Sequence, residues 1–555
     1  MQVKNLFKFI FLVSAIAYGQ NNISPLDIPI KLSGTFGELR NTHFHTGIDI
    51  KTGGTQGLKV KAVKKGYLSR VRVSVGGYGK SLYIKHYDGT TSVYAHLKKF
   101  SDVIEKYVKK IQYKNRSYEI QSFPKVDEIT FDSGELIGYS GNTGSSSGPH
   151  LHFEIRNSKS NSPLNPLNLN LNLNIEDTIN PIIKGIYLYK VYKNGGYKFL
   201  KEVPIKKISN DTYEASLIKQ IGRIGIGINY YDKQDRSYSK NGAYHLNLIV
   251  NDNSIFNYKM NEISFNDKKF LKLLVDYKNW YLNKNKIQKL FIHPKSSYSF
   301  IEDLSKNGII NLLKDDNYGG KIEIKDYNGN KTHVILKFSG IKKDTLFDKS
   351  DKKIIYPNYE YNIGFKGIEV NFPKNTFYNP TSLKISTRND TLDLGKNIHP
   401  INKSFEIKFQ SDLLDSLTKA KGFISKITKY GKPLFLKTTK SDSIWSVNVS
   451  SLGKYTFSID TVAPIISPIN FKEKQWLSNL KNLKLKVKDD LSGVKSIEGI
   501  INGQWVLFEY EPKNNTIIYN FSDLNFPDGE HKLVITVEDL NGNKSKYQTV
   551  FFRKN

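Results

Sequence analysis

Cysteine is absent from the 555 residues of this chain. Its absence excludes disulfide bonds, thiolate nucleophiles, cysteine-ligated zinc and a cysteine-linked lipid anchor. Arginine is scarce, with nine of the 83 basic residues, although it is the side chain best suited to bidentate contacts with phosphate and guanine. The formal net charge of +31 is therefore a weak argument for nucleic acid, and we expect no nucleic-acid partner.

Long apolar runs are also missing beyond the N-terminal stretch "MQVKNLFKFIFLVSAIAYGQ". That stretch combines a basic start, a short apolar run and small residues, which predicts a signal peptide over residues 1–19 with cleavage near residues 17–20. We therefore expect export, to the periplasm or the cell exterior, and no transmembrane segment in the mature protein. The excess of lysine has two interpretations. It fits partners in the envelope, either anionic polymers or a protein, or it reflects only a compositional bias toward Lys, Asn and Ile.

The region after this leader, residues 20–175, is predicted to contain an antiparallel sheet. Three segments with strand-like alternation follow one another between turn signals: "GYLSRVRVSV", "KSLYIKH" and "TTSVYAHL". Residues 101–112, "SDVIEKYVKKIQ", break that rhythm and predict a short helix that begins with a Ser or Asp cap. The sequence thus indicates a mainly β fold for the first domain.

The rest of the chain repeats two short motifs. "DTINPII" at residues 177–183 recurs as "DTVAPII" at 460–466, and "DYNGN" at 326–330 recurs as "DLNGN" at 539–543. Each pair suggests a module that opens with a Pro-containing strand and has an Asn-Gly hairpin near its end. We predict three β-sandwich modules, at residues 176–340 with a helical insertion, at 341–459 and at 460–555.

Six of the eleven histidines lie between residues 43 and 152. In "HTGID", His45 and Asp49 stand four residues apart, and a neutral imidazole with a carboxylate suits zinc. In "SGPHLHFEI", alternation places His150 and His152 on one face of an extended segment. His152 would be a third ligand, which leaves the fourth position open, as catalytic zinc requires.

Other polar residues are predicted to surround this site. His96, in "SVYAHL", and His150 would present two further imidazoles to the same cleft. Tyr94 and Glu154 share strand faces with these residues, so they would line the groove or support the ligands, with ordinary packing an equal alternative. His43 is assigned to the cleft edge or to a structural role.

Four segments, "HFHTGIDI", "GGYGKSLYIKH", "VYAHL" and "GELIGYSGNTGSSSGPHLHFEIR", resemble in order and spacing the lysostaphin and LytM-type zinc endopeptidases, which cut peptidoglycan peptides. The resemblance covers roughly residues 34–170. It implies that His45, Asp49 and His152 bind zinc, and that His96 and His150 handle protons and stabilise the oxyanion. The segment "KKIQYKNRSYEIQSFP" is longer than compact relatives need, and we expect it to form a wall of the groove.

These observations together predict a zinc metalloendopeptidase that hydrolyses peptide cross-links or stem peptides of peptidoglycan, with Zn²⁺ as its cofactor. The later modules resemble immunoglobulin-like accessory modules, which implies that they target the protein to the envelope. Because these modules dominate the chain by mass, the alternative is a non-catalytic wall-binding scaffold or an activator of another wall hydrolase.

Overall fold

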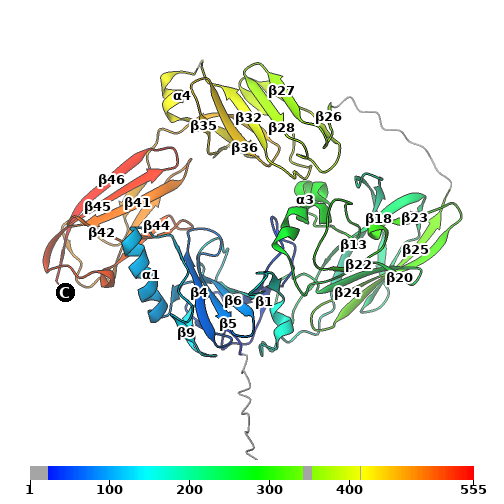
Figure 1. Ribbon diagram of the computed structural model, residues 1–555, viewed down its shortest axis with the longest axis horizontal. Coiled ribbons are helices and arrows are strands. Elements are labelled where there is room, and N and C mark those ends of the chain that lie inside the picture. The colour runs from blue at the N-terminus through cyan, green and yellow to red at the C-terminus, as the bar shows by residue number, and fades with distance from the viewer. Residues whose placement is uncertain (1–22, 342–352, 413, 555) are drawn as a thin grey trace, which may run out of the picture.

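The computed structural model describes residues 23–341, 353–412 and 414–554, so the predicted signal peptide lies outside the described residues. Over these ranges the protein is mainly β, with an antiparallel-sheet domain followed by further β-sheet regions (Figure 1). No helix of the described ranges combines the length and apolar character needed to span a membrane.

The first domain is built on one large sheet with antiparallel neighbours in the order β1-β2-β11-β6-β5-β4-β8. In that order the strands are β1 (Leu32–Gly34), β2 (Ile48–Lys51), β11 (His150–Asn157), β6 (Thr90–Leu97), β5 (Lys80–His86), β4 (Gly66–Val73) and β8 (Ile120–Ser122). β12 (Pro163–Leu164) pairs with β11, and β9 (Thr130–Phe131) pairs with β4. A smaller sheet contains β3 (Lys59–Lys61), β10 (Leu136–Tyr139) and β7 (Lys99–Phe100).

Strand β11 occupies a central place in the large sheet, between β2 and β6. His152 is directly opposite Asp49 of β2 and Ala95 of β6. Directly opposed residues of antiparallel strands point to the same face of a sheet. The register of β11 therefore brings His152 and Asp49 together, although 103 residues separate them in sequence.

The predicted short helix forms as α1 (Asp102–Asn115), with Ser101 at its N-cap. The expectation that "KKIQYKNRSYEIQSFP", residues 109–124, forms a wall of the groove is wrong, because none of these residues lines the cleft that contains His96 and His150. This segment forms the end of α1 and then β8, which lies at the opposite end of the strand order from β1. The segment contacts the C-terminal region instead: the ring of Tyr113 lies 5.4 Å from that of Trp505.

The second region has two sheets. One contains β14 (Tyr197–Val203), β13 (Ile182–Val191), β18 (Gly222–Tyr231), β21 (Gln288–Lys289) and β23 (Ile310–Leu312). The other contains β15 (Ile205–Lys207), β16 (Thr212–Ala215), β17 (Ile218–Gln220), β25 (Lys331–Gly340), β24 (Asn317–Lys325), β19 (His245–Val250), β20 (Asn253–Lys259) and β22 (Ile301–Leu304). The predicted helical insertion is present as α2 (Leu271–Leu274) and α3 (Tyr277–Asn283).

The third region contains two five-stranded sheets. The first is β27 (Tyr361–Phe365), β28 (Ile368–Phe372), β32 (Phe405–Gln410), β36 (Ile444–Val449) and β35 (Thr439–Lys440). The second is β30 (Ser386–Arg388), β31 (Thr391–Asp393), β37 (Lys454–Ile459), β33 (Gly422–Ile427) and β34 (Pro433–Phe435). β26 (Lys353–Ile355) pairs with β29 (Thr381–Leu383), and α4 (Ser416–Lys421) precedes β33.

The fourth region has a sheet of β38 (Ile465–Pro468), β40 (Asn482–Lys488), β44 (Thr516–Asn520) and β43 (Glu509–Glu511). Its second sheet is β39 (Gln475–Trp476), β46 (Lys544–Arg553), β45 (Gly529–Asp539), β41 (Val494–Ile501) and β42 (Gln504–Val506). Alternation in "LKLKVK" explains β40, since Leu483, Leu485 and Val487 are fully buried and the lysines between them are not.

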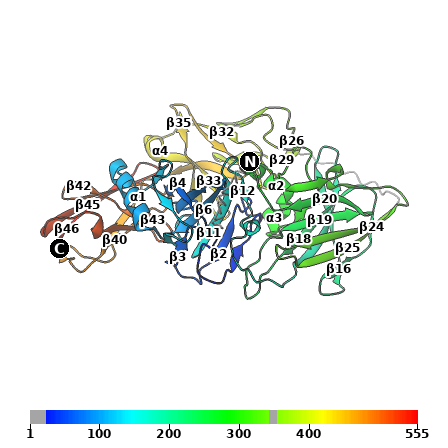
Figure 2. The same ribbon diagram turned by 60° about the horizontal axis from the view of Figure 1, so that its bottom comes forward.

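The buried apolar side chains form separate cores. One core is continuous from Leu26 in the first domain to Phe338 in the second region. Two others span Ile355 to Tyr455 and Phe471 to Phe551. The chain follows a closed path, in which the strands of the fourth region lie beside helix α1 (Figures 1 and 2). At this contact Lys80 of β5 donates to Glu509 of β43 at 2.8 Å, and Lys109 of α1 pairs with Asp523.

Candidate metal centre

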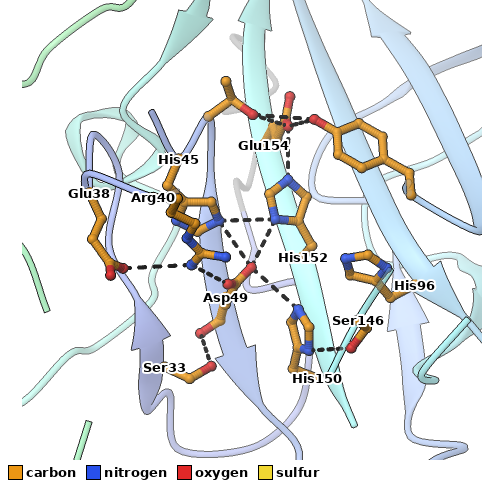
Figure 3. Close-up of polar contacts among 12 residues, drawn as sticks. Ser33, Glu38, Arg40, His45, Asp49, His96, Ser146, His150, His152 and Glu154 are labelled. Atoms are coloured by element: carbon orange, nitrogen blue, oxygen red, sulfur yellow. Dashed lines mark hydrogen bonds and ion pairs between the residues drawn. The ribbon is translucent and has the colours of Figure 1, made fainter. Parts of the chain in front are cut away.

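Three side chains from two neighbouring strands and the turn before them converge at one end of the large sheet. His45 lies in the turn before β2, Asp49 lies in β2, and His152 lies in β11 (Figure 3). His45 Nε2 is 3.1 Å from Asp49 Oδ1 and 3.1 Å from His152 Nδ1. His152 Nδ1 is 2.8 Å from Asp49 Oδ1. All three residues are buried, with exposed fractions of 4% or less.

The other polar atom of each of these side chains is already hydrogen-bonded. His45 Nδ1–H donates to the carbonyl of Thr35 at 2.8 Å, and His152 Nε2–H donates to Glu154 Oε1 at 2.8 Å. Arg40 Nη2 donates to Asp49 Oδ2 at 2.6 Å. These bonds fix the tautomers of both imidazoles. They leave one possible metal-ligating atom of each side chain facing the common centre: His45 Nε2, Asp49 Oδ1 and His152 Nδ1.

The three atoms that face the centre fit a bound cation. Two imidazole lone pairs and a carboxylate oxygen repel one another at 2.8–3.1 Å unless a positive charge lies between them. Their separations are close to about 3.4 Å, the edge of a tetrahedron with zinc–ligand bonds of about 2.1 Å. Two histidines and an aspartate are also a donor set typical of zinc, and one coordination position remains for water or substrate.

The charges at the site agree with this interpretation. Burial opposes ionisation of Asp49, but its interactions with the neighbouring imidazoles His45, His150 and His152 hold its pKa well below the ordinary value. Burial also disfavours the charged form of His152, yet hydrogen bonds to Asp49 and Glu154 raise its pKa to about 9. The centre thus attracts positive charge, as either a proton or a metal ion.

Two further imidazoles lie beside the triad. The ring of His96 is 4.9 Å from that of His150 and 5.9 Å from that of His152. His96 Nδ1–H donates to the carbonyl of Thr143, and His150 Nδ1–H donates to that of Gly148, each at 2.8 Å. In both rings Nε2 is left for the cleft, and that of His150 is 3.4 Å from Asp49 Oδ1. Burial and the adjacent His152 and His150 lower the pKa of His96 to about 3.

The structure thus brings together His45, Asp49, His96, His150, His152 and Glu154, all of which the sequence analysis named. His43 is exposed and its Nδ1 contacts Thr42, so it lies outside the triad.

Tyr94 has the second of its two expected roles, ordinary packing, and does not line the groove. It is directly opposite Phe153, is fully buried in the core, and accepts a hydrogen bond from Val63 N–H at 2.9 Å. Simple alternation along β6 fails because the backbone of His96 has φ +60°, in the left-handed region. This local twist brings His96 to the face of His152, while Tyr94 remains on the core face.

Several residues that support the site carried no recognisable sequence signal. Tyr78 lies in a turn whose sequence, "GGYG", indicates only a glycine-rich turn. It donates to Glu154 Oε1, and its ring lies 5.1 Å from that of His152. Arg156 Nη2 also pairs with Glu154 at 2.6 Å. Glu38 and Arg40 precede the turn that carries His45, and both line the cleft in front of the metal centre. The loop 145–149 also lines this cleft.

Comparison with known proteins agrees with this geometry. Residues 43–113 and 124–166 match peptidase family M23, and the unmatched residues between them contain the end of α1 and all of β8. A DD-carboxypeptidase/endopeptidase, Mpg, of Neisseria meningitidis serogroup B is 33% identical over 158 residues, which are 28% of this chain and 30% of the relative. An uncharacterized metalloprotease of Haemophilus influenzae is 32% identical over 121 residues, 22% of this chain and 20% of the relative.

Among solved structures, the catalytic domain of lysostaphin from Staphylococcus simulans is 28% identical, with 25% of this chain and 87% of that domain covered and a TM-score of 0.18. This chain spans less than a third of the length of the curated relatives that it matches. Residues 43–113 and 124–166 therefore form a domain of peptidase family M23, in which His45, Asp49 and His152 are the zinc-binding triad.

Proposed function

We propose that this chain is a zinc-dependent endopeptidase that hydrolyses an amide bond in the peptides of peptidoglycan. The observation that supports the proposal is one cleft that Asp49 of the triad lines together with His96 and His150, whose rings are held through Nδ1. A wall peptide as substrate is supported by the curated relative, a DD-carboxypeptidase/endopeptidase.

When bound, zinc supplies a Lewis acid that polarises an amide carbonyl and acidifies water. His96 and His150 then supply the proton-handling groups, because each ring donates its Nδ1–H to a carbonyl and leaves Nε2 for the cleft. One of the two accepts the proton of the attacking water. That imidazole later delivers the proton to the leaving amine, while the other helps to stabilise the developing oxyanion.

The test is the release of new amino groups from purified peptidoglycan, with and without a zinc chelator. We expect release that the chelator abolishes and that added Zn²⁺ restores. Mass analysis of fragments from defined muropeptides then identifies the bond, in a stem peptide or in a cross-link. Chelator-insensitive release, or no release from any wall preparation, would contradict the proposal.

A second candidate function, a non-catalytic wall-binding scaffold or activator of another hydrolase, is supported by one contact. Lys513 of the fourth region donates to the carbonyl of Asn142, next to Thr143, whose carbonyl holds His96. The C-terminal region thus touches the loop that shapes the cleft. Wall binding without amino-group release, together with stimulation of a second hydrolase, would favour this alternative.

We propose that residues 176–340, 341–459 and 460–555 are β-sandwich modules of immunoglobulin-like type that position the peptidase domain on the envelope after export. The separate cores within residues 355–455 and 471–551 support this division of the later chain. Cosedimentation of the full chain and of a variant that ends at residue 340 with purified wall tests the role. Equal wall binding by both would contradict it.

A further inference from the structure

The motifs that repeat along the chain meet in space as a cluster of three aspartates. Asp177 belongs to "DTINP", Asp326 begins "DYNGN", and Asp232 directly follows β18. One carboxylate oxygen from each lies within 4.8 Å of the other two. The three residues come from the segment after the peptidase domain and from both sheets of the second region, so one ligand at this point would hold three separate segments together.

A second observation distinguishes this cluster from an ordinary acidic surface. Asp232 is only 3% exposed, and its Oδ1 has no hydrogen-bond partner. Asn241 is 5% exposed, and its Oδ1 also has none. Two backbone hydrogen bonds of 2.9–3.0 Å join these two residues, and both line the cavity that Asp177 and Asp326 line. An orphaned buried oxygen costs free energy unless a donor or a cation satisfies it.

The electrostatics of the cluster point the same way. Burial, with the charges of Asp326 and Asp177, raises the pKa of Asp232 to about 9. Burial, with the charges of Asp326 and Asp235, raises the pKa of Asp177 to about 6. Asp326 is already held by Asn330, whose N–H and side-chain amide both donate to its carboxylate. Three ionised carboxylates are therefore unfavourable together at this buried place unless a positive charge accompanies them.

We propose that Asp177, Asp232 and Asp326, with the amide oxygen of Asn241, bind a Ca²⁺ ion. The donors are all oxygen, three of them carboxylates, which is the set that calcium prefers and that zinc does not. Calcium accepts such irregular sets, whereas Mg²⁺ demands near-ideal octahedral geometry and keeps several waters.

The bound ion would brace the peptidase domain. The loop between Asp232 and Asn241 carries Gln234, which accepts from Leu32 N–H and donates to the Ile30 carbonyl at 2.8 and 3.0 Å. The N–H of Gly242 donates to Thr35 Oγ1 at 3.0 Å. Thr35 is also the residue whose carbonyl orients His45.

The second copies of the motifs form a similar corner that serves as an internal control. Asp460, Asp489 and Asp539 also offer oxygens within 4.8 Å of one another. Asn543 donates to the Asp460 carbonyl at 2.9 Å, as Asn330 does to that of Asp177. No carboxylate oxygen of this corner, however, is among the buried unpartnered atoms of the described residues.

The test is calorimetric titration of CaCl₂ into the zinc-loaded full chain in calcium-free buffer, for wild type, Asp232→Asn and Asp489→Asn. We expect wild type to bind Ca²⁺, Asp232→Asn to lose one site or weaken it at least tenfold, and Asp489→Asn to keep that site. Zinc content and far-UV circular dichroism establish that each variant is folded.

Thermal unfolding gives a second readout of the same site. Calcium should raise the unfolding temperature of wild type and of Asp489→Asn but not of Asp232→Asn, since Asn in place of a carboxylate removes charge that the ion needs. The proposal is overturned if wild type binds no Ca²⁺ up to about 10 mM, beyond the weak end of protein calcium sites. It is also overturned if Asp232→Asn binds like wild type, or if Mg²⁺ binds as tightly as Ca²⁺.

Discussion

His152 donates its Nε2 proton to Glu154 Oε1 across 2.8 Å, and this bond leaves Nδ1 as the atom that faces Asp49 and His45. Glu154 is fully buried and has no exposure to water. Its carboxylate remains ionised because the charge of Arg156 and the hydrogen bond from His152 lower its pKa more than burial raises it. The orientation and basicity of a zinc ligand thus depend on a side chain that does not touch the metal.

Replacement of Glu154 by Gln should weaken zinc binding by about 10- to 100-fold, because the ring of His152 loses an ionised acceptor. The measurement is competition with a zinc chelator of known affinity. Glu302→Gln, at a side chain that is 41% exposed, is the matched control and should leave the affinity unchanged. Equal affinities of the two variants would show that Glu154 does not support the ligand.

His152→Ala should lose both zinc and peptidase activity, whereas His96→Ala should keep zinc and lose about 10²- to 10⁴-fold in activity, the usual contribution of a proton-transfer group. Zinc is measured by elemental analysis of dialysed protein, and folding by circular dichroism. His43→Ala is the control, since this exposed neighbour of the ligand turn should change neither quantity. An active, metal-free His152→Ala protein would overturn the assignment of the triad.

Glu509→Gln should destabilise the contact between the fourth region and the peptidase domain. Lys80 is buried there and would lose its only ion-pair partner among the described residues, at a cost on the order of 3 kcal/mol. The measurement is thermal unfolding of the full chain, with the exposed Glu498→Gln as control. An unfolding temperature of Glu509→Gln equal to that of the control would contradict this role.

The same pair gives a pH dependence. Burial opposes ionisation of Glu509, but the charge and hydrogen bond of Lys80 outweigh it and lower the pKa of Glu509 below 4.5. Its stabilising contribution is therefore complete above pH 4.5 and is lost as the pH falls through the lowered pKa. Unfolding temperatures of wild type and Glu509→Gln should converge in this acidic range, and a constant difference down to pH 3 would contradict the assignment.

Lys289→Met should stabilise the protein at pH 7. The ammonium of Lys289 is 3.9 Å from the ring centre of Tyr197 and is almost fully buried, and burial lowers its pKa to about 7 although Asp276 opposes the shift. Between pH 7 and 10.5 the unfolded chain binds the proton and the folded chain does not, so wild-type stability rises with pH in this window. The methionine variant should lack that rise.

Denaturant unfolding at pH 7 and pH 9 measures both effects of this change. The gain at pH 7 should be on the order of 2 kcal/mol, less whatever cation–π stabilisation is lost. Lys321→Met, at a side chain that is 44% exposed, is the control and should change neither value. A loss of stability for Lys289→Met at pH 7 would show that the buried charge is satisfied.

Much of the metal centre could be predicted because its chemistry is carried by residue types at short spacing. Alternation along "HLHFE" is a local property of an extended chain, so His150, His152 and Glu154 share a face wherever that strand lies. The same logic failed at Tyr94, because it assumed regular backbone through His96, whose φ of +60° changes the face. A single left-handed residue leaves no mark in a hydrophobic pattern.

The sequence by itself determined the mainly β character of the chain, the four-residue spacing of His45 and Asp49, and the donor types of the triad, since these follow from side-chain chemistry and local backbone geometry. Only the tertiary structure decided that His152 is opposite Asp49, that α1 meets the fourth region rather than the cleft, and that Asp177, Asp232 and Asp326 come together. Those relationships depend on strand register and on packing between distant segments. Register and packing are set by buried area and hydrogen bonding over the whole fold, so no short stretch of sequence encodes them.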